Sequence, residues 1–386
     1  MSVNISFSER SQLYNVEPIG IGTANVESLT GYISRISNLH CFKTGDLISK
    51  VITPIVHKNY LSSIAERGGD GFYKSAAAIN GTCNLAQDFV NVLERLTTRD
   101  DLRAITLLNI SHLVPTRGLL RKTKAWCPRC YHQDTTNNEV VYERLLWNFQ
   151  AVSVCVYHDQ KLSFHCPCCD NTIPVITRNS RAGFCSNCET WLGGDQVKAI
   201  EEELSIAAKR PVILISEILS TQFFWFDVEK NRCNSISSSL SYYIKKYFND
   251  DKSKAAKYIG VPKSTFTGWY KGESLPQIKS LVLICMKLGV TIVEFLQRSE
   301  AHINTTNIDI SMPEGSEKVR YDHVKIKGIL EGIIENCTPI SVKKVAELIG
   351  CDRKLLYVKY REVCEVIKNN YIEHLQKRKK NEIRRN

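Results

Sequence analysis

The 386-residue chain contains no long apolar run. Its most apolar stretch, from Pro211 to Leu219, is interrupted by Glu217, whereas a membrane-spanning helix needs about 20 consecutive apolar residues. The N-terminal segment, which begins MSVNISFSER, also lacks the basic and then apolar pattern of a secretory signal. We therefore expect a cytoplasmic protein that makes no contact with a membrane.

Motifs typical of catalytic sites are also missing. The sequence has no His-Glu-x-x-His motif, no glycine-rich phosphate-binding loop and no acidic cluster that suggests a nuclease. The GGDG segment at 68–71 is expected to form a loop rather than a phosphate cradle. We therefore predict that the protein is not an enzyme. The alternative is an enzyme, either a RING-type ligase or a zinc hydrolase.

The features that the chain does have are length, positive charge and cysteine. A chain of 386 residues is too long for one small core, so several domains are expected. The hydrophobic content of 43% is ordinary for a globular protein. The formal net charge of +11 favours acidic partners such as nucleic acid.

Seven of the 15 cysteines join one histidine in four pairs, each with two residues between its members. The ligands predicted from these pairs are Cys127, Cys130, Cys155, His158, Cys166, Cys169, Cys185 and Cys188. Two intervening residues allow one tight turn to direct both side chains at a single tetrahedral ion. The eight residues therefore predict two structural zinc ions, each with four protein ligands and no open position for water.

The spacing leaves the pairing of these ligands open. Sequential pairing gives two zinc ribbons side by side, and the fifteen residues between Cys169 and Cys185 suit such a ribbon. Interleaved pairing gives a cross-brace like that of RING ligases. The seven residues between His158 and Cys166 argue against it, because RING modules place the histidine very close before the next cysteine. Three other residues lie close enough in the sequence to compete as ligands, namely His132, His165 and Cys168.

The spacing of apolar residues predicts a mostly α-helical, multidomain chain. Helical periodicity runs through residues 26–37 and 83–96, whereas residues 126–194 favour short strands and turns around metal sites. Polar linkers are expected at 231–239 and 303–319. The predicted domains are an N-terminal helical region at 1–125, a tandem zinc-ribbon or zinc-finger module at 126–194, a helical connector at 195–235, and two helix-turn-helix units at 240–298 and 320–386.

The first helix-turn-helix unit is predicted from the segment DKSKAAKYIGVPKSTFTGWYKG, which starts at Asp251. Gly260 ends its first helix and Pro262 opens the second, as proline does at the start of a helix. The N-terminal half of the second helix is where such a unit meets base edges in the major groove. The predicted DNA contacts are Lys263, Ser264, Thr265, Thr267 and Lys271. A helical bundle that packs on a protein partner is the alternative interpretation.

The second helix-turn-helix unit is predicted from the segment SVKKVAELIGCDRKLLYVKYREVCEVI. Residues 341–386 hold 13 Lys/Arg against 6 Asp/Glu, and this positive charge would make binding to phosphates sensitive to salt. The predicted DNA contacts are Arg353, Lys354, Tyr357, Lys359 and Arg361. For the terminal KRKK run, a solvated tail is an equally weighted alternative.

In this order, the features resemble the TniQ/TnsD family of target-selection proteins of multi-component, TnsABC-type DNA transposons. The matching residues are Glu27-Ser-Leu29 with Tyr32 and Arg35, LERLTTRDDLRAITLL at 93–108, Trp126-Cys-Pro-Arg-Cys130, Leu146-Trp147, Cys155-Val-Tyr-His158 with Leu162, Cys166-Pro-x-Cys169 and Cys185-x-x-Cys188. The C-terminal VAELIGCDRKLLYVKYREVCEVI is similar to the tail modules of the TnsD branch. Cys168, an extra thiol, is the departure from the family pattern.

This resemblance implies a protein that finds the insertion target and recruits a AAA+ ATPase regulator of the TnsC type, with the N-terminal region as the expected ATPase contact. The favoured hypothesis is TnsD-like, in which the protein reads the attachment site in double-stranded DNA directly, because a pure adaptor needs neither helix-turn-helix units nor a basic tail. The alternative is a TniQ-like adaptor that links a CRISPR Cascade effector to the AAA+ regulator for RNA-guided transposition.

Overall fold

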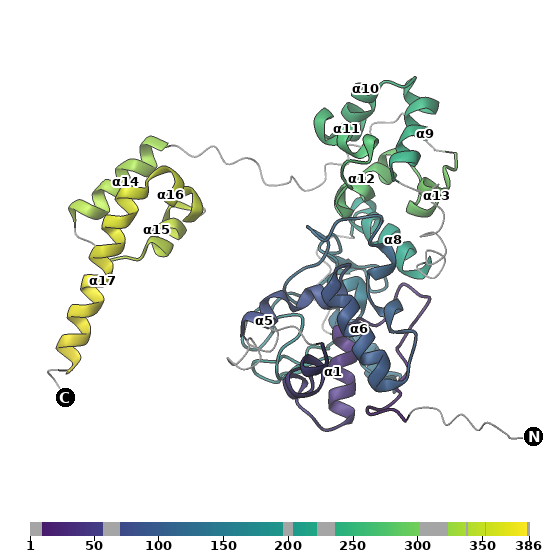
Figure 1. Cartoon of the computed structure of the whole chain (residues 1–386), viewed down its shortest axis with the longest axis horizontal. Coiled ribbons are helices and arrows are strands. Elements are labelled where there is room, and N and C mark those ends of the chain that lie inside the picture. The colour runs from purple at the N-terminus through teal and green to yellow at the C-terminus, as the bar shows by residue number, and fades with distance from the viewer. Residues whose placement is uncertain are drawn as a thin grey trace, which may run out of the picture. The chain divides into compact units, whose positions relative to one another are not determined.

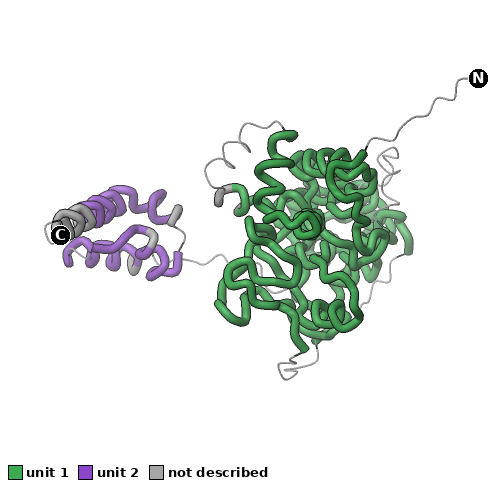
Figure 2. The backbone as a smooth tube through the Cα atoms, turned by 90° about the horizontal axis from the view of Figure 1, so that it is seen from below, with its two compact units in different colours: residues 1–308 green, residues 309–386 purple. Residues whose placement is uncertain are grey.

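The chain divides into two compact units, residues 1–308 and 309–386, which are coloured separately in Figure 2. The computed structural model describes residues 10–56, 70–195, 204–221, 236–300, 323–336, 339–351 and 353–383. Helices dominate both units, as Figure 1 shows, which confirms the prediction of a mostly α-helical chain. None of the helices in these described ranges is long and apolar enough to cross a membrane.

The first part of unit 1 is built from α-helices with short 3-10 and π-helical turns between them. The α-helices are α1 (Leu29–Leu39), α2 (Thr44–Asp46), α3 (Thr53–Val56), α5 (Asp70–Ser75) and α6 (Asn84–Thr97). The other turns are a π-helix (Leu47–Ile52) and 3-10 helices at Ala76–Asn80, Leu102–Ile105 and Leu108–Ile110. The two helices expected from apolar periodicity are therefore present as α1 and α6.

Helices α1 and α6 form where the sequence carries both an apolar stripe and a defined end. Ser28 precedes α1, and its hydroxyl accepts a hydrogen bond from the backbone N–H of Gly31, as an N-cap residue does. On α6, the apolar side chains at Phe89 and Leu93 are fully buried. That helix ends at Thr97 and is followed by Thr98, whose left-handed backbone has a φ of 56°. The buried stripes place both helices against the core of unit 1.

The central part of unit 1 contains one helix that the sequence pattern did not predict. Residues 126–194 were expected to form strands and turns, but α7 runs from Pro128 to Thr136 and begins directly after Cys127. Pro128 occupies the first helical position, which a proline favours because its missing N–H has no helical partner there. The expected strands are limited to β1 (Val154–Cys155) and β2 (Gln160–Lys161), which pair antiparallel, and a 3-10 turn lies at Leu145–Asn148.

The N-terminal helices and this central part meet at the backbone of residues 143–145. The N–H of Ser28 donates to the carbonyl of Glu143 at 2.8 Å, and the N–H of Leu145 donates to the carbonyl of Val26 at 2.8 Å. Gly31 has to be a glycine here, because a Cβ atom at this position would lie 2.7 Å from the Cβ of Glu143. Helix α1 therefore lies against the segment between α7 and β1.

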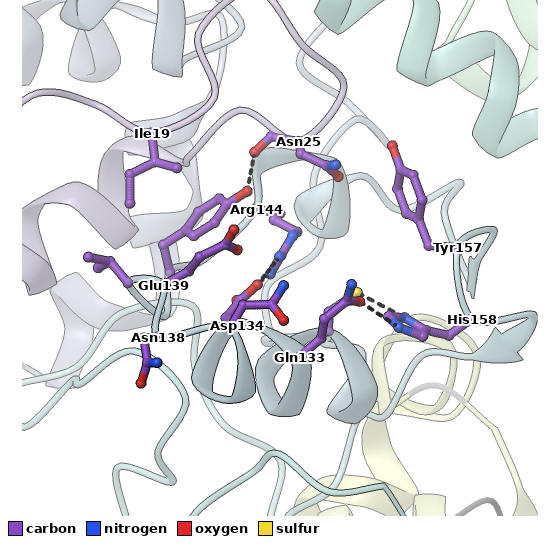
Figure 3. Close-up of a pocket in the computed structure, with 13 residues that line it drawn as sticks. Ile19, Asn25, Gln133, Asp134, Asn138, Glu139, Arg144, Tyr157 and His158 are labelled. Carbon is purple, nitrogen blue, oxygen red and sulfur yellow. Dashed lines mark hydrogen bonds and ion pairs between the residues drawn. The ribbon is translucent and has the colours of Figure 1, made fainter.

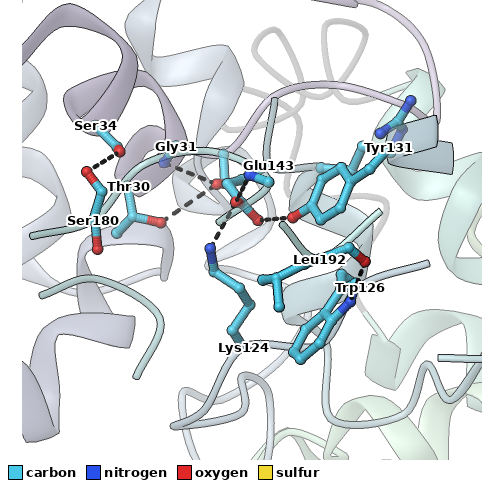
Figure 4. Close-up of polar contacts among 12 residues, drawn as sticks. Thr30, Gly31, Ser34, Lys124, Trp126, Tyr131, Glu143, Ser180 and Leu192 are labelled. Carbon is cyan, nitrogen blue, oxygen red and sulfur yellow. Dashed lines mark hydrogen bonds and ion pairs between the residues drawn. The ribbon is translucent and has the colours of Figure 1, made fainter. Parts of the chain in front are cut away.

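The side chain of Glu143 gathers buried polar partners at this junction (Figure 4). One carboxylate oxygen accepts a hydrogen bond from Lys124 at 2.7 Å, and the other accepts one from the hydroxyl of Tyr131 at 2.6 Å. The side chains of Lys124 and Glu143 are only 7% and 10% exposed. A buried carboxylate requires such partners, because an unpaired charge in the interior is costly.

A second contact joins the N-terminal helices to residues 178–180, which lie between the last two cysteine pairs. The carbonyl of Ser180 accepts hydrogen bonds from the hydroxyls of Ser34 and Thr44, at 2.9 and 2.8 Å. The N–H of Gly45 donates to the carbonyl of Arg178 at 3.0 Å. Both cysteine-rich segments are thus attached to the helices that precede them.

The rest of unit 1 is helical. Its helices are α8 (Ile206–Thr221), α9 (Ile236–Phe248), α10 (Lys252–Ile259), α11 (Lys263–Lys271), α12 (Ile278–Leu288) and α13 (Ile292–Gln297). Helix α8 contacts β1 on one side and α12 and α13 on the other, so it connects the cysteine-rich segment to the last helices. Helix α9 begins inside the stretch expected to be a linker at 231–239, whose first residues lie outside the described ranges, as does the linker expected at 303–319.

Unit 2 consists of four helices around its own small core. They are α14 (His323–Glu335), α15 (Val342–Ile349), α16 (Arg353–Lys359) and α17 (Arg361–Ile383). The core is formed by buried apolar residues from all four helices, among them Leu330, Val345, Leu356 and Cys364. The finer domain boundaries proposed from the sequence within units 1 and 2 stay predictions.

We predict that Glu143→Gln destabilises unit 1 by about 3 kcal/mol, because the change removes the charge that balances the buried Lys124. Denaturant unfolding followed by circular dichroism measures the loss. Asp46→Asn is the matched control, since the ion pair of Asp46 with Lys50 is exposed and should contribute little. If both variants shift the unfolding midpoint equally, the junction at Glu143 does not have the structural role assigned to it.

Candidate metal centres and nucleic-acid interface

The first four predicted ligands meet at the start of α7. Cys127 and Cys130 come from the N-terminal end of that helix, Cys155 from β1, and His158 from the turn between β1 and β2. The Nδ1 atom of His158 lies 3.5 Å from the Sγ of Cys127, 3.3 Å from that of Cys130 and 3.6 Å from that of Cys155. All three cysteines are buried.

The second four predicted ligands form a separate cluster. The Sγ atoms of Cys166 and Cys188 lie 3.5 Å apart, and those of Cys169 and Cys185 lie 3.8 Å apart. Cys166 and Cys185 are buried, whereas Cys188 is exposed. The two groups of four could each hold a metal ion. The ligands are therefore grouped sequentially, and the interleaved alternative does not describe this chain.

The distances fit a tetrahedral metal and exclude disulfides. A zinc ion bound at about 2.3 Å by sulfur and about 2.0 Å by nitrogen places neighbouring sulfur atoms about 3.8 Å apart, and a nitrogen about 3.5 Å from each sulfur. The observed S–S separations of 3.5 to 3.8 Å agree with this geometry. A disulfide needs about 2.05 Å, and all seven cysteines are free thiols.

Neighbouring groups shift the thiol pKa values in both directions. Hydrogen bonds with Cys130 and Cys155 lower the pKa of the Cys127 thiol far below its usual range, and the same contacts raise the pKa of Cys130 and of Cys155. In the second cluster, a hydrogen bond with the hydroxyl of Thr190 lowers the pKa of Cys188 to about 6, and burial raises that of Cys166. Because the thiolate is the form that binds a metal, Cys127 and Cys188 are the ligands that these contacts favour.

Two glutamines hold the first cluster from outside. The Nε2 of His158 lies 3.0 Å from the Oε1 of Gln133 on α7, so with Nδ1 facing the cluster, Nε2 carries the proton and donates it. The Nε2 of Gln160 donates to the Sγ of Cys127 at 3.0 Å. The sequence pattern did not identify either glutamine, although Gln133 lies three residues after Cys130 on the same helix, so its side chain can face the same site.

The competing ligands considered from the sequence stand apart from both clusters. Cys168 is exposed and belongs to neither group, although it adjoins Cys169. His132 and His165 are also absent from the two groups. The ligands of the second cluster are therefore Cys166 and Cys169, together with Cys185 and Cys188, and not Cys168.

The predicted DNA contacts of the first helical unit lie together on α11. Lys263, Ser264, Thr265 and Lys271 are exposed, and Thr267 is half-buried. On the other face of the same helix, Phe266 and Trp269 are buried, 0% and 5% exposed. Burial of these two rings turns the N-terminal half of α11 outward.

The predicted contacts of unit 2 lie on α16 and at the start of α17. Tyr357, Lys359 and Arg361 are exposed, and Leu356 is fully buried behind them. Arg353 and Lys354 belong to α16, but their side chains lie outside the described residues. Helices α15 and α16 pack against each other and against α17.

Comparison with known protein families gives one match, to the TniQ family, over residues 18–162. Residues 18–162 therefore form a TniQ domain. A search of the curated proteins finds no match. The resemblance seen in the sequence is thus confirmed for the TniQ domain.

The TniQ domain includes both the N-terminal helices and the segment that carries the first cluster, which contact each other in the structure. The match includes the first cluster and ends before Cys166, so it crosses the boundary expected at residue 125. The motif residues Glu27 and Arg35 form an ion pair of 2.6 Å, in which the glutamate is fully buried and the arginine 10% exposed. Burial raises the pKa of Glu27, and the hydrogen bond and charge of Arg35 oppose that rise. This pair of TniQ motif residues is therefore part of the buried interior of unit 1.

We predict that Gln133→Ala weakens metal binding at the first cluster by about 10- to 100-fold, because the histidine loses the partner that orients its ring. Competition with a chromophoric chelator on the purified chain measures the affinity of each ion. Gln150→Ala is the matched control, since Gln150 is exposed and touches neither cluster. Equal affinities in the two variants would show that Gln133 has no part in the site.

Proposed function

We propose that this TniQ-domain protein is a TnsD-like target selector that reads an attachment site in double-stranded DNA and recruits a AAA+ regulator of the TnsC type. The observation that carries the proposal is the outward N-terminal half of α11, where Lys263, Ser264 and Thr265 are all exposed. A positively charged helix N-terminus with short polar side chains suits both phosphates and base edges in a major groove.

The local structure supports a helix-turn-helix reading of this unit. Asp251 caps α10 by accepting hydrogen bonds from the N–H groups of Ser253 and Lys254, at 2.8 and 3.0 Å. Gly260 ends α10 with a φ of 85°, a left-handed backbone that a side chain would strain. Only Val261 and Pro262 then precede α11, which packs against both α9 and α10. Such a tight turn between two packed helices fixes the outward face of the second one.

Unit 2 is proposed as a second reader. Its helices α15 and α16 repeat the arrangement, with Ser341 capping α15 and Gly350 ending it at a φ of 73°. The buried core shared by the four helices supports a folded module rather than a disordered tail. Two readers on one chain lengthen the recognised site, and each lost base contact costs about 1–3 kcal/mol.

Both metal clusters are proposed to hold structural zinc. Four protein donors surround each site, three cysteines with one histidine at the first and four cysteines at the second, and these are the usual donor sets of structural zinc. A site with four protein ligands keeps no position for a reacting water, so we propose a role in holding the fold and no enzymatic activity. Native mass spectrometry of the purified chain tests both the metal and the count of two ions.

The second candidate is a TniQ-like adaptor that docks on a Cascade effector and passes its position to the AAA+ regulator. The observation in its favour is that the family match covers only residues 18–162 and includes none of the proposed reader helices. Fluorescence anisotropy with attachment-site DNA and with shuffled DNA separates the candidates. Preference of the isolated chain for the attachment site supports the direct reader, whereas equal binding and co-purification with Cascade support the adaptor.

We predict that Lys263→Ala weakens binding to all DNA sequences and reduces the slope of log affinity against log salt by about 1, because one phosphate contact is lost. Thr265→Ala should instead reduce the preference for the attachment site. Lys50→Ala removes the same charge from an exposed position in the N-terminal helices and serves as the control. A salt slope that falls equally in Lys263→Ala and Lys50→Ala contradicts a phosphate contact on α11.

A further inference from the structure

A cavity of about 780 Å³ lies beside the first metal cluster, at a place that none of the proposed DNA contacts lines (Figure 3). It is enclosed by the C-terminal turn of α7, the loop that carries Asn25, and the metal-binding turn that carries Tyr157. Its volume falls within the range of about 300–1,000 Å³ that is usual for ligand sites. Cys130 and His158 of the first cluster also line it, so one wall of the cavity belongs to the metal site.

Arg144 lines the cavity, but its charge is already neutralised. It binds Asp134 through two hydrogen bonds, of 2.6 and 3.1 Å, and both side chains are less than 10% exposed. Its guanidinium also lies over the rings of Tyr142 and Trp147, at 4.4 and 4.9 Å. Burial alone would lower the pKa of Arg144, but the hydrogen bonds with Asp134 and the neighbouring charges raise it above its usual range. This arginine is therefore committed to Asp134 rather than to a phosphate or carboxylate ligand.

The C-terminal end of α7 provides negative charge to the cavity. The helix ends at Thr136, and Asn138 adopts a left-handed backbone with a φ of 55°. The N–H groups of Asn137, Asn138 and Glu139 bind carbonyl groups of the last turn, and the aligned peptide dipoles still place a partial negative charge at this end of the helix. Glu139 follows directly, is exposed, and has no ion-pair partner within the described part of the chain. Both features favour a cation in the cavity.

Tyr157 adds an exposed aromatic ring to the lining of the cavity. Tyr157 is 59% exposed and stands between the metal ligands Cys155 and His158, so the ligand turn fixes its backbone. In Figure 3 its ring lies on the side of the cavity away from Glu139. A guanidinium or ammonium group is attracted to the face of such a ring. The amide side chains of Asn25 and Asn137 add hydrogen-bonding groups to the same lining.

We propose that this cavity binds a lysine or arginine side chain presented by an exposed segment of a protein partner. The volume exceeds that of one side chain, and the amides of the lining suit the N–H and C=O groups of the peptide that bears it. The chain as a whole carries a net charge of +11, which disfavours non-specific binding of a basic peptide. Binding of such a peptide therefore reports on this local site. The role proposed for the site, binding of a protein partner, is separate from DNA recognition.

The test uses the purified full chain with its metal ions and a short fluorescein-labelled peptide of alternating arginine and glycine. Fluorescence anisotropy should show saturable binding. Replacing each arginine by citrulline, which keeps the shape and removes the charge, should weaken binding about tenfold. Glu139→Gln and Tyr157→Leu should each weaken it about threefold, the effect of losing one exposed charge or one cation–ring contact.

Controls separate a local site from other causes. Glu335→Gln makes the same charge change on α14, outside the cavity, and should leave binding unchanged. Metal content and thermal midpoint show whether Tyr157→Leu keeps the ligand turn intact, and Glu139→Gln tests the proposal without touching that turn. Equal affinity for the citrulline peptide, or equal effects of Glu139→Gln and Glu335→Gln, would overturn the proposal. Spermidine and the unlabelled arginine peptide are compared as competitors of the labelled peptide. If spermidine displaces it at a lower concentration than the unlabelled peptide does, the proposal is overturned and the site is assigned to polyamines.

Discussion

Two ligands of the first metal cluster stand at the start of α7 and two stand around β1, and Cys130 and Cys155 are 25 positions apart in the chain. An ion shared by these four side chains closes that intervening segment into a loop whose ends cannot separate. The loop contains Glu143 and Leu145, which bind the backbone of Ser28 and Val26 at the start of α1. Because α1 takes its place from this loop, we infer that the first metal cluster positions the N-terminal helices as well as its own turn.

The second cluster has the same relation to the same helices. Its ligands flank residues 178–180, whose carbonyl groups bind Ser34 of α1 and Thr44 and Gly45 of α2. Helix α8 connects this scaffold to the last helices, because it contacts β1 as well as α12 and α13. Helix α12 packs against α10 and helix α13 against α9, and α9 and α10 are the helices that support the proposed reader α11. We propose that, in unit 1, the two ligand clusters hold the scaffold and that exposed faces elsewhere are left for partners. The proposed partners are DNA at the α11 face and a cation in the cavity beside Tyr157.

The sequence predicted the parts of this account that depend on short-range pattern. Ligand pairs two residues apart, the apolar stripes of α1 and α6, and the Gly260–Pro262 turn are all visible in a few neighbouring residues. The eight ligands came together in two groups of four, and the pairing that the spacing left open is sequential. The sequence also carries the TniQ motif residues, although not their contacts. In the structure, Glu27 and Arg35 form a buried ion pair and Ser28 caps α1.

The parts that were missed depend on long-range packing. Composition rich in Cys, His and Asn suggested turns, yet Pro128 starts a helix that buries Tyr131 against Glu143. No local pattern links Lys124, Glu143 and Ser28, since their contacts exist only once the chain has folded. The cavity at Asn25 and Tyr157 likewise joins residues more than a hundred positions apart.

The central claim is that the first metal cluster positions the N-terminal helices. Hydrogen–deuterium exchange of the intact chain, before and after a strong chelator removes its metal, tests this claim most directly. The account predicts that the amides of α1 lose their protection together with those of α7, while the amides of α14 to α17 in unit 2 keep theirs. Full protection of α1 in the metal-free chain would contradict it.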